Sequence, residues 1–150
     1  SVYRMSVGLM APASRGRLDL GPVADGRRAG VHLAHLARDE DAERLAAGVR
    51  TAAALLDVMA ESGEVRLPPS PWWRAHDLVA EMRARVTTYN HPVGTCAIGD
   101  VVDDRLRFDG VTGLRIADAS VMPTIPRANT NLASMMIGRR AAQMVVEDEA

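Results

Sequence analysis

Two turn-rich stretches between Tyr89 and Gln143 constrain this chain more than any other feature. The first is YNHPVGTC, residues 89–96, and the second is DASVMPTIPRANTN, residues 118–131, which leads into an apolar segment. His91 lies beside Pro92 and close to Gly94, so it cannot sit in a regular helix or a central strand, because proline lacks an amide donor and glycine relaxes the backbone. The second stretch ends where a helix is predicted to begin, and Asn129 and Thr130 are residue types that accept hydrogen bonds from free helix amides.

These motifs also carry a family resemblance. The runs HPVGTC (91–96), GVTGLRIADASVMPTIP (110–126) and NTN (129–131) follow one another in the order found at the C-terminal end of glucose-methanol-choline (GMC) flavin oxidoreductases, and the chain resembles that region. The likeness covers nearly the whole chain. A complete member opens with a dinucleotide-binding GxGxxG motif, and no glycines here have that spacing after a strand.

Length and composition narrow the classes of function. The 150 residues suggest one domain over 1–150, and 47% hydrophobic with 25% charged residues is typical of a globular protein. The net charge of −1 gives no reason to expect nucleic acid or an anionic membrane as a partner, and no stretch is apolar enough to span a membrane. All 18 basic residues are arginine, which excludes a lysine Schiff base and a P-loop. A single cysteine cannot form an internal disulfide, in keeping with the reducing cytoplasm.

The pattern of apolar residues predicts an α+β fold, a mainly antiparallel sheet flanked by helices. Strands are expected at 3–9, 17–20, 101–102, 106–108 and 114–117, the first two joined by a turn at 11–16, with a loop over 21–30. Helices are expected at 39–60, with Asp39 as cap and a buried stripe of Leu45, Val49, Ala52, Leu56 and Met59, and from Ser70-Pro71 to about Val86. The last helix is expected at about 130–147, buried nearly all round at its start.

Alcohol oxidation explains why His91 is the residue of most interest. Removing a hydride from an alcohol carbon requires a group that accepts the hydroxyl proton, and histidine, with an ordinary pKa of about 6.5, suits this task. The resemblance places His91 at the family's catalytic histidine and Asn129 at its partner, which can bond the substrate oxygen but cannot take its proton. Asn129 also suits a helix cap. The geometric expectation is that the imidazole of His91 and the start of the last helix meet.

The resemblance implies FAD as cofactor, with most of its binding energy supplied by an FAD-binding N-terminal portion or subunit outside this chain. The helix start carries about half a positive charge and would stabilise the charge that arrives on a flavin with the hydride. The resemblance also implies that Thr130 and Asn131, just after the Asn129 position, contact the flavin, and that Asp118 and Ala119 lie close to it. Asp118 equally suits a turn acid. The resemblance therefore implies part of a choline dehydrogenase-like alcohol oxidoreductase with a small alcohol as substrate.

Several alternatives stay open. The chain is also compatible with a non-catalytic module that binds a partner protein, with an isolated fragment that does not bind FAD alone, and with a homodimer. The start at Ser1 suggests that something upstream was removed or lies on another chain.

Other conspicuous residues have simpler explanations than chemistry. Trp72 and Trp73 suit helix packing better than a substrate entrance, and Cys96 suits a small buried residue better than a nucleophile. No metal site is expected, because His32, His35 and His76 lack ligands at a suitable spacing. Arg127 suits either recognition of an anionic substrate group or an exposed surface.

Overall fold

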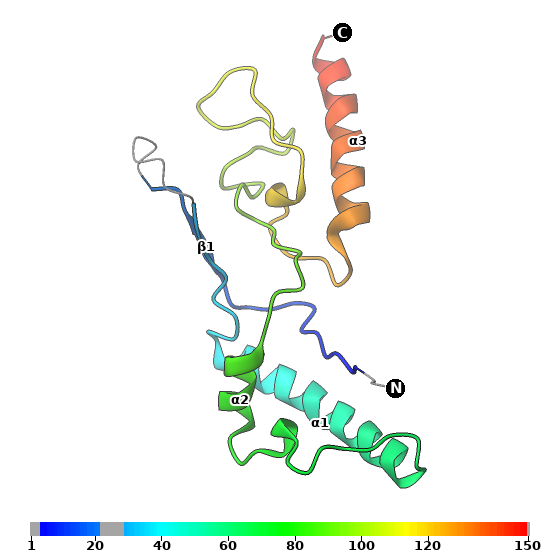
Figure 1. Ribbon diagram of the computed structural model, residues 1–150. Coiled ribbons are helices and arrows are strands. Elements are labelled where there is room, and N and C mark those ends of the chain that lie inside the picture. Colours follow the sequence, from blue (N-terminus) through cyan, green and yellow to red (C-terminus); the bar gives the residue numbers. More distant parts are fainter. Residues whose placement is uncertain (1–3, 22–28, 150) are drawn as a thin grey trace. The chain divides into compact units, whose positions relative to one another are not determined.

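The longest helix, α1 (Asp39–Glu61), confirms the expected helix to within one residue (Figure 1). The computed structural model describes residues 4–21 and 29–149. The residue before α1 is Arg38, which makes no capping bond with its side chain, so Asp39 is the first helical residue and not the cap. The predicted stripe is buried at Leu45 and Val49 and only half-buried from Ala52 onward.

An aspartate completes the buried face of α1. Asp41 precedes Leu45 by one helical turn and is fully buried. Its carboxylate accepts hydrogen bonds from the Ala13 amide (2.9 Å), the Ser14 amide (2.7 Å) and the Ser14 hydroxyl (2.6 Å). These bonds fix the proline-glycine turn of residues 11–16 onto α1.

The predicted second helix is broken into two pieces. A 3-10 turn, η2 (Trp72–Arg74), is followed by extended backbone at Ala75 and then by α2 (Leu78–Arg85). Asp77 starts α2 by accepting a bond from the Ala80 amide at 2.9 Å, and this local cap explains why the helix begins there. Leu78 and Met82 pack with the stripe of α1, with both tryptophans against them.

The predicted N-terminal hairpin is also revised. Of the first expected strand, Tyr3 lies outside the described residues, and residues 4–9 are not in a strand. The second is present as β1 (Arg17–Asp19), but its antiparallel partner is β2 (Gly30–His32), with Leu18 opposite Val31. Most of the expected 21–30 loop lies outside the described residues.

After Tyr89, short bridges replace the predicted strands. Val102 bridges to Ile98 and to Phe108, and Arg107 bridges to Arg115, so the three expected strands are single ladder contacts. Asp103 and two glycines in left-handed conformation, Gly110 and Gly113, turn the chain before longer pairing can form. A second core lies here, made of Val102, Leu106, Val121, Ala141 and Met144.

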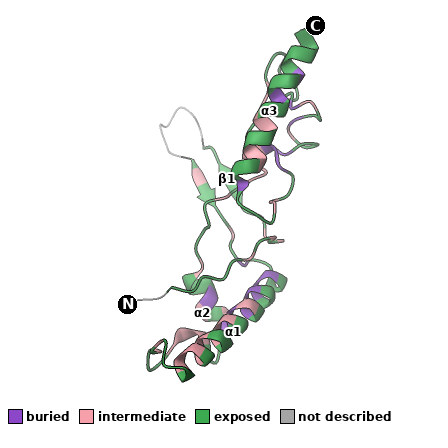
Figure 2. Ribbon diagram, turned by 90° about the vertical axis from the view of Figure 1, so that its right-hand side faces the viewer, coloured by how far each residue is buried: buried purple, intermediate pink, exposed green. Residues whose placement is uncertain are grey.

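The last helix, α3 (Thr130–Glu149), confirms the expected position and lies beside these loops (Figure 1). Its predicted burial at the start is wrong. Leu132, Met135 and Met136 are 72%, 63% and 71% exposed, and the buried residues are Thr130, Ala141 and Met144. Figure 2 shows the contrast, with mostly exposed residues along α3 and a buried stripe on the first part of α1.

The chain divides into two compact units, Ser1–Tyr89 and Asn90–Ala150. In the described residues the fold combines helices with an antiparallel pair of strands, which confirms the α+β class, with a smaller sheet than expected. The view of 1–150 as one domain stays a prediction. No helix in the described part is long and apolar enough to cross a membrane.

Candidate active site

The backbone around His91 is bent on both sides of the histidine. Asn90 has φ = 62° and Gly94 has φ = 86°, both in the left-handed region. Asparagine is among the few residues other than glycine that adopt this region readily. The half-buried His91 therefore lies in an irregular turn, as its proline and glycine neighbours predicted.

The side chain of His91 meets the start of α3. Its Nδ1 lies 3.2 Å from the hydroxyl Oγ1 of Thr130, the first residue of the helix. Thr130 is only 8% exposed, and its carbonyl accepts a bond from the Ser134 hydroxyl at 2.8 Å. The two stretches expected to meet are in contact, through a residue that sequence reasoning had given a different task.

The backbone joins the His91 segment to the Asp118 segment. The Cys96 amide donates to the Ser120 carbonyl (2.9 Å), and the Ile98 amide donates to the Val121 carbonyl (3.0 Å). Val121 is fully buried in the second core. His91, the Asp118 turn and the first residue of α3 are thus held within one unit by hydrogen bonds.

Asp118 shapes its own turn. It precedes the 3-10 turn η3 (Ala119–Val121), and its carboxylate accepts bonds from the Ser120 amide (2.8 Å) and hydroxyl (2.5 Å). The hydroxyl and then the amide of Ser120 lower the pKa of Asp118, while partial burial opposes them. Asp118 therefore acts as the turn acid, and a flavin contact at Asp118 or the half-buried Ala119 stays a prediction.

The first turn of α3 is open to solvent on one side. Asn129, Asn131 and Leu132 are exposed, so polar and apolar groups lie next to each other at the positive end of the helix dipole. The roles of Asn129, Thr130 and Asn131 toward a cofactor remain predictions, and Arg127 is exposed.

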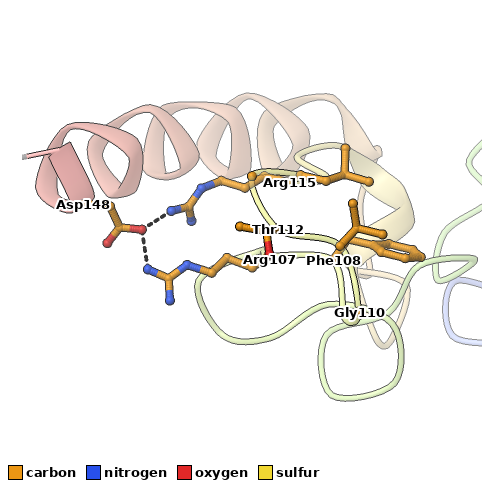
Figure 3. Close-up of a pocket in the computed structure, with 9 residues that line it drawn as sticks. Arg107, Phe108, Gly110, Thr112, Arg115 and Asp148 are labelled. Carbon is orange, nitrogen blue, oxygen red and sulfur yellow. Dashed lines mark hydrogen bonds and ion pairs between the residues drawn. The ribbon is translucent and has the colours of Figure 1, made fainter.

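A cluster of arginines at the far end of α3 escaped sequence reasoning. The guanidinium groups of Arg107 and Arg115 converge on Asp148 and line a pocket of ≈ 590 Å³ together with Phe108 and Thr112 (Figure 3). Arg105 also reaches Asp148 at 2.7 Å. Hydrogen bonds from Arg107 and then Arg115 lower the pKa of Asp148 to about 2, although desolvation opposes them. No motif spacing signals this cluster, because its members are 33 to 43 residues apart from Asp148 in sequence.

The other singled-out residues lie outside this site. Trp72 and Trp73 pack edge to face, with centroids 5.9 Å apart, in the first unit. Cys96 is a free, half-buried thiol. His32, His35 and His76 are exposed, and His32 pairs with Asp19 at 2.9 Å. No group of three or more metal-ligating side chains occurs among the described residues.

Comparison with known proteins agrees with this arrangement. The family model for GMC oxidoreductases, C-terminal part, matches residues 12–138. An alcohol dehydrogenase (acceptor) of Pseudomonas putida is 34% identical over 96% of this chain and 27% of its own length, and the ecdysone oxidase of Bombyx mori is 32% identical over 93% and 22%.

Solved structures give the same result. A formate oxidase of Aspergillus oryzae, described with mutation R554A and FAD modification, matches with a TM-score of 0.82 at 26% identity, covering 93% of this chain and 26% of that one. A fungal aryl-alcohol oxidase matches with a TM-score of 0.75 at 26% identity, over 93% and 24%. This chain spans about a quarter of the length of these relatives, and it belongs to the GMC oxidoreductases as a C-terminal region of that family of flavoenzymes.

Proposed function

We propose that this chain forms the substrate side of an FAD-dependent, choline dehydrogenase-like alcohol oxidoreductase, with His91 as the base. The observation that carries the proposal is the contact between His91 and the first residue of α3 at 3.2 Å. Of the four histidines, His91 is the one that is half-buried. Thr130, the first residue of α3, has an exposed asparagine on each side, Asn129 and Asn131. The family membership supports the same assignment.

The residues of this chain would divide the work as follows. His91 accepts the hydroxyl proton of the alcohol as the C–H bond is cleaved. Asn129 donates a hydrogen bond from its side-chain amide to the alcohol oxygen and fixes its orientation. The first turn of α3, with Thr130 and Asn131, supplies amide dipoles that favour negative charge nearby. A flavin bound beside these residues would supply the hydride-accepting chemistry.

The exposed apolar start of α3 supports an association with a further part of the protein. Leu132, Met135 and Met136 are more than 60% exposed, and such neighbouring apolar groups usually mark an interface or a ligand surface. The relatives are about four times as long as this chain. We assign the cover to the FAD-binding portion, which would also hold the adenine and pyrophosphate of the cofactor.

The test is His91→Gln in the complete flavoenzyme, with His76→Gln as matched control, since His76 is exposed and lies in the first unit. We expect the rate of flavin reduction by a saturating alcohol to fall by about 10²–10⁴-fold for His91→Gln, the usual contribution of a general base. The control should keep its rate. Flavin reduction at the original rate in His91→Gln would end the proposal.

One observation favours a second function. The apolar surface of α3 would equally serve a non-catalytic chain that binds another protein. Flavin absorbance of the purified complete protein separates the two functions, because only the oxidoreductase requires a bound flavin.

A further inference from the structure

The side chain of His91 contacts the hydroxyl of Thr130, a residue to which the proposed mechanism assigns only a backbone role. Thr130 is the first residue of α3 and is almost fully buried. Its hydroxyl faces Nδ1 of His91, while the Ser134 hydroxyl holds its carbonyl from the next turn. The hydroxyl is therefore held close to the imidazole by a helix with a buried anchor at Ala141 and Met144.

We propose that Thr130 is a positioning residue that sets the tautomer of His91: the Nδ1–H of the imidazole donates to Oγ1 of Thr130, and Nε2 carries the lone pair. This inference rests on the proposed function, because it names which nitrogen of the base takes the alcohol proton.

The chemistry favours this direction of the bond. A neutral imidazole carries one proton, and the nitrogen that lacks it is the one able to accept another. With the proton on Nδ1, Nε2 accepts the hydroxyl proton of the alcohol, and the imidazolium that results still donates from Nδ1 to the same hydroxyl. The bond to Thr130 thus persists through the transfer and strengthens as the ring becomes charged. A bond that fixes the ring before and after the transfer leaves no reorganisation to the reaction step.

The decisive variants are Thr130→Val, which replaces the hydroxyl by a methyl group of the same size, and Thr130→Ser, which restores it. Thr112→Val is the matched control, because Thr112 is an exposed threonine of the same unit. In the complete flavoenzyme we expect Thr130→Val to lower the limiting rate of flavin reduction by about 10–100-fold, similar to the loss when a residue that orients a metal-binding histidine is removed. The dissociation constant of the alcohol should change by less than about 3-fold, and Thr130→Ser should recover most of the rate.

A second measurement does not depend on turnover. Nitrogen-15 NMR of the histidine-labelled enzyme, with His91→Gln to identify the signals, should show a protonated Nδ1 and an unprotonated Nε2 in the neutral state, and a mixture of tautomers in Thr130→Val. A protonated Nε2 in the unmodified enzyme would overturn the inference, even if Thr130→Val folds poorly.

The two proposals fail in different ways. An unchanged limiting rate in Thr130→Val, together with a large loss in His91→Gln, would remove the role of Thr130 and leave His91 as the base. An unchanged rate in His91→Gln would remove both. A loss in Thr130→Val that appears only as weaker alcohol binding would also overturn positioning, since it would assign Thr130 to the substrate.

Discussion

The two long helices, α1 and α3, differ in how far their apolar residues are buried. α1 buries its stripe inside the first unit, where Ala42, Leu45, Ala46 and Val49 are at most 9% exposed. α3 buries only its first residue and two positions in its second half, Ala141 and Met144, and leaves Leu132 and Met136 more than 70% exposed. The apolar pattern of a helix therefore predicts which of its residues can be buried. The packing partners present in the chain decide which of them are buried.

The chain offers separate probes for the two units. Both tryptophans and both tyrosines belong to the unit that ends at Tyr89, while the single cysteine, Cys96, belongs to the other. Tryptophan fluorescence therefore reports on the surroundings of α1 and α2, and the labelling rate of Cys96 reports on the surroundings of His91.

The largest effect is expected for Asp41→Ala. The change leaves two amides and a hydroxyl without their acceptor in a buried place, which should destabilise the first unit by about 3 kcal/mol. The urea midpoint followed by tryptophan fluorescence should fall, with Cys96 labelling unchanged. Glu43→Gln, an exposed acid on the same helix, is the control and should leave both signals unaltered. Equal losses in both probes would show that the units unfold together.

Val121→Ala should destabilise the second unit and leave the first unit unchanged. Val121 is fully buried in the second core, and losing its two methyl groups should cost about 2 kcal/mol. Faster labelling of Cys96 without a change in the fluorescence midpoint is the expected result. Val146→Ala, at a 67% exposed position of α3, serves as the comparison, and similar acceleration there would contradict the assignment of Val121 to the core.

Acid should loosen the far end of α3 before the rest of the second core. Because the folded pKa of Asp148 is about 2, below its ordinary 3.8, the native chain holds a proton there less readily than the unfolded chain. Its contribution to stability is complete above about pH 4 and is lost as the pH falls from about 4 to about 2. Carbon-13 NMR of the buried Met144 methyl group should show this change.

Asp148→Asn should remove that acid dependence, whereas Asp104→Asn, an exposed acid of the same unit, should retain it. An identical acid response in the unmodified chain and in Asp148→Asn would show that the arginine cluster contributes nothing measurable.

The smallest effect is expected for Met136→Gln in this chain alone. Met136 is 71% exposed, so its replacement should change the free energy of unfolding by no more than about 0.5 kcal/mol. In the complete protein the same change should weaken flavin retention, if the apolar start of α3 is covered there as proposed. A large loss of stability in the chain alone would show that Met136 already has a packing partner.

The sequence analysis located what depends on local patterns and missed what depends on distant contacts. Helix α1 was found because its apolar residues recur at helical spacing, and α3 because cap-type residues precede an apolar segment. The turn at His91 was found because proline and glycine limit the backbone. The break at Ala75 was missed, since a single capping aspartate, Asp77, outweighed the helical pattern. The short strands were overpredicted because alternating apolar residues do not reveal whether a partner strand lies beside them.

Within the candidate site the same division holds. His91 and the start of α3 follow from motifs, but the bond through Thr130 depends on the rotation of the helix about its axis.

One clue to a hidden contact was available in the first unit: Asp41 occupies the position one turn before Leu45, on the apolar face of α1. A charged residue on an apolar stripe requires hydrogen-bonding partners, and here they come from residues 13 and 14.

The two backbone bonds from residues 96 and 98 to residues 120 and 121 have a consequence for how such a site diversifies. Both bonds join main-chain groups, so they leave the identity of the amino acids at 96 and 98 open. A substitution at either position, other than by proline, would therefore keep both bonds and the alignment of the loop.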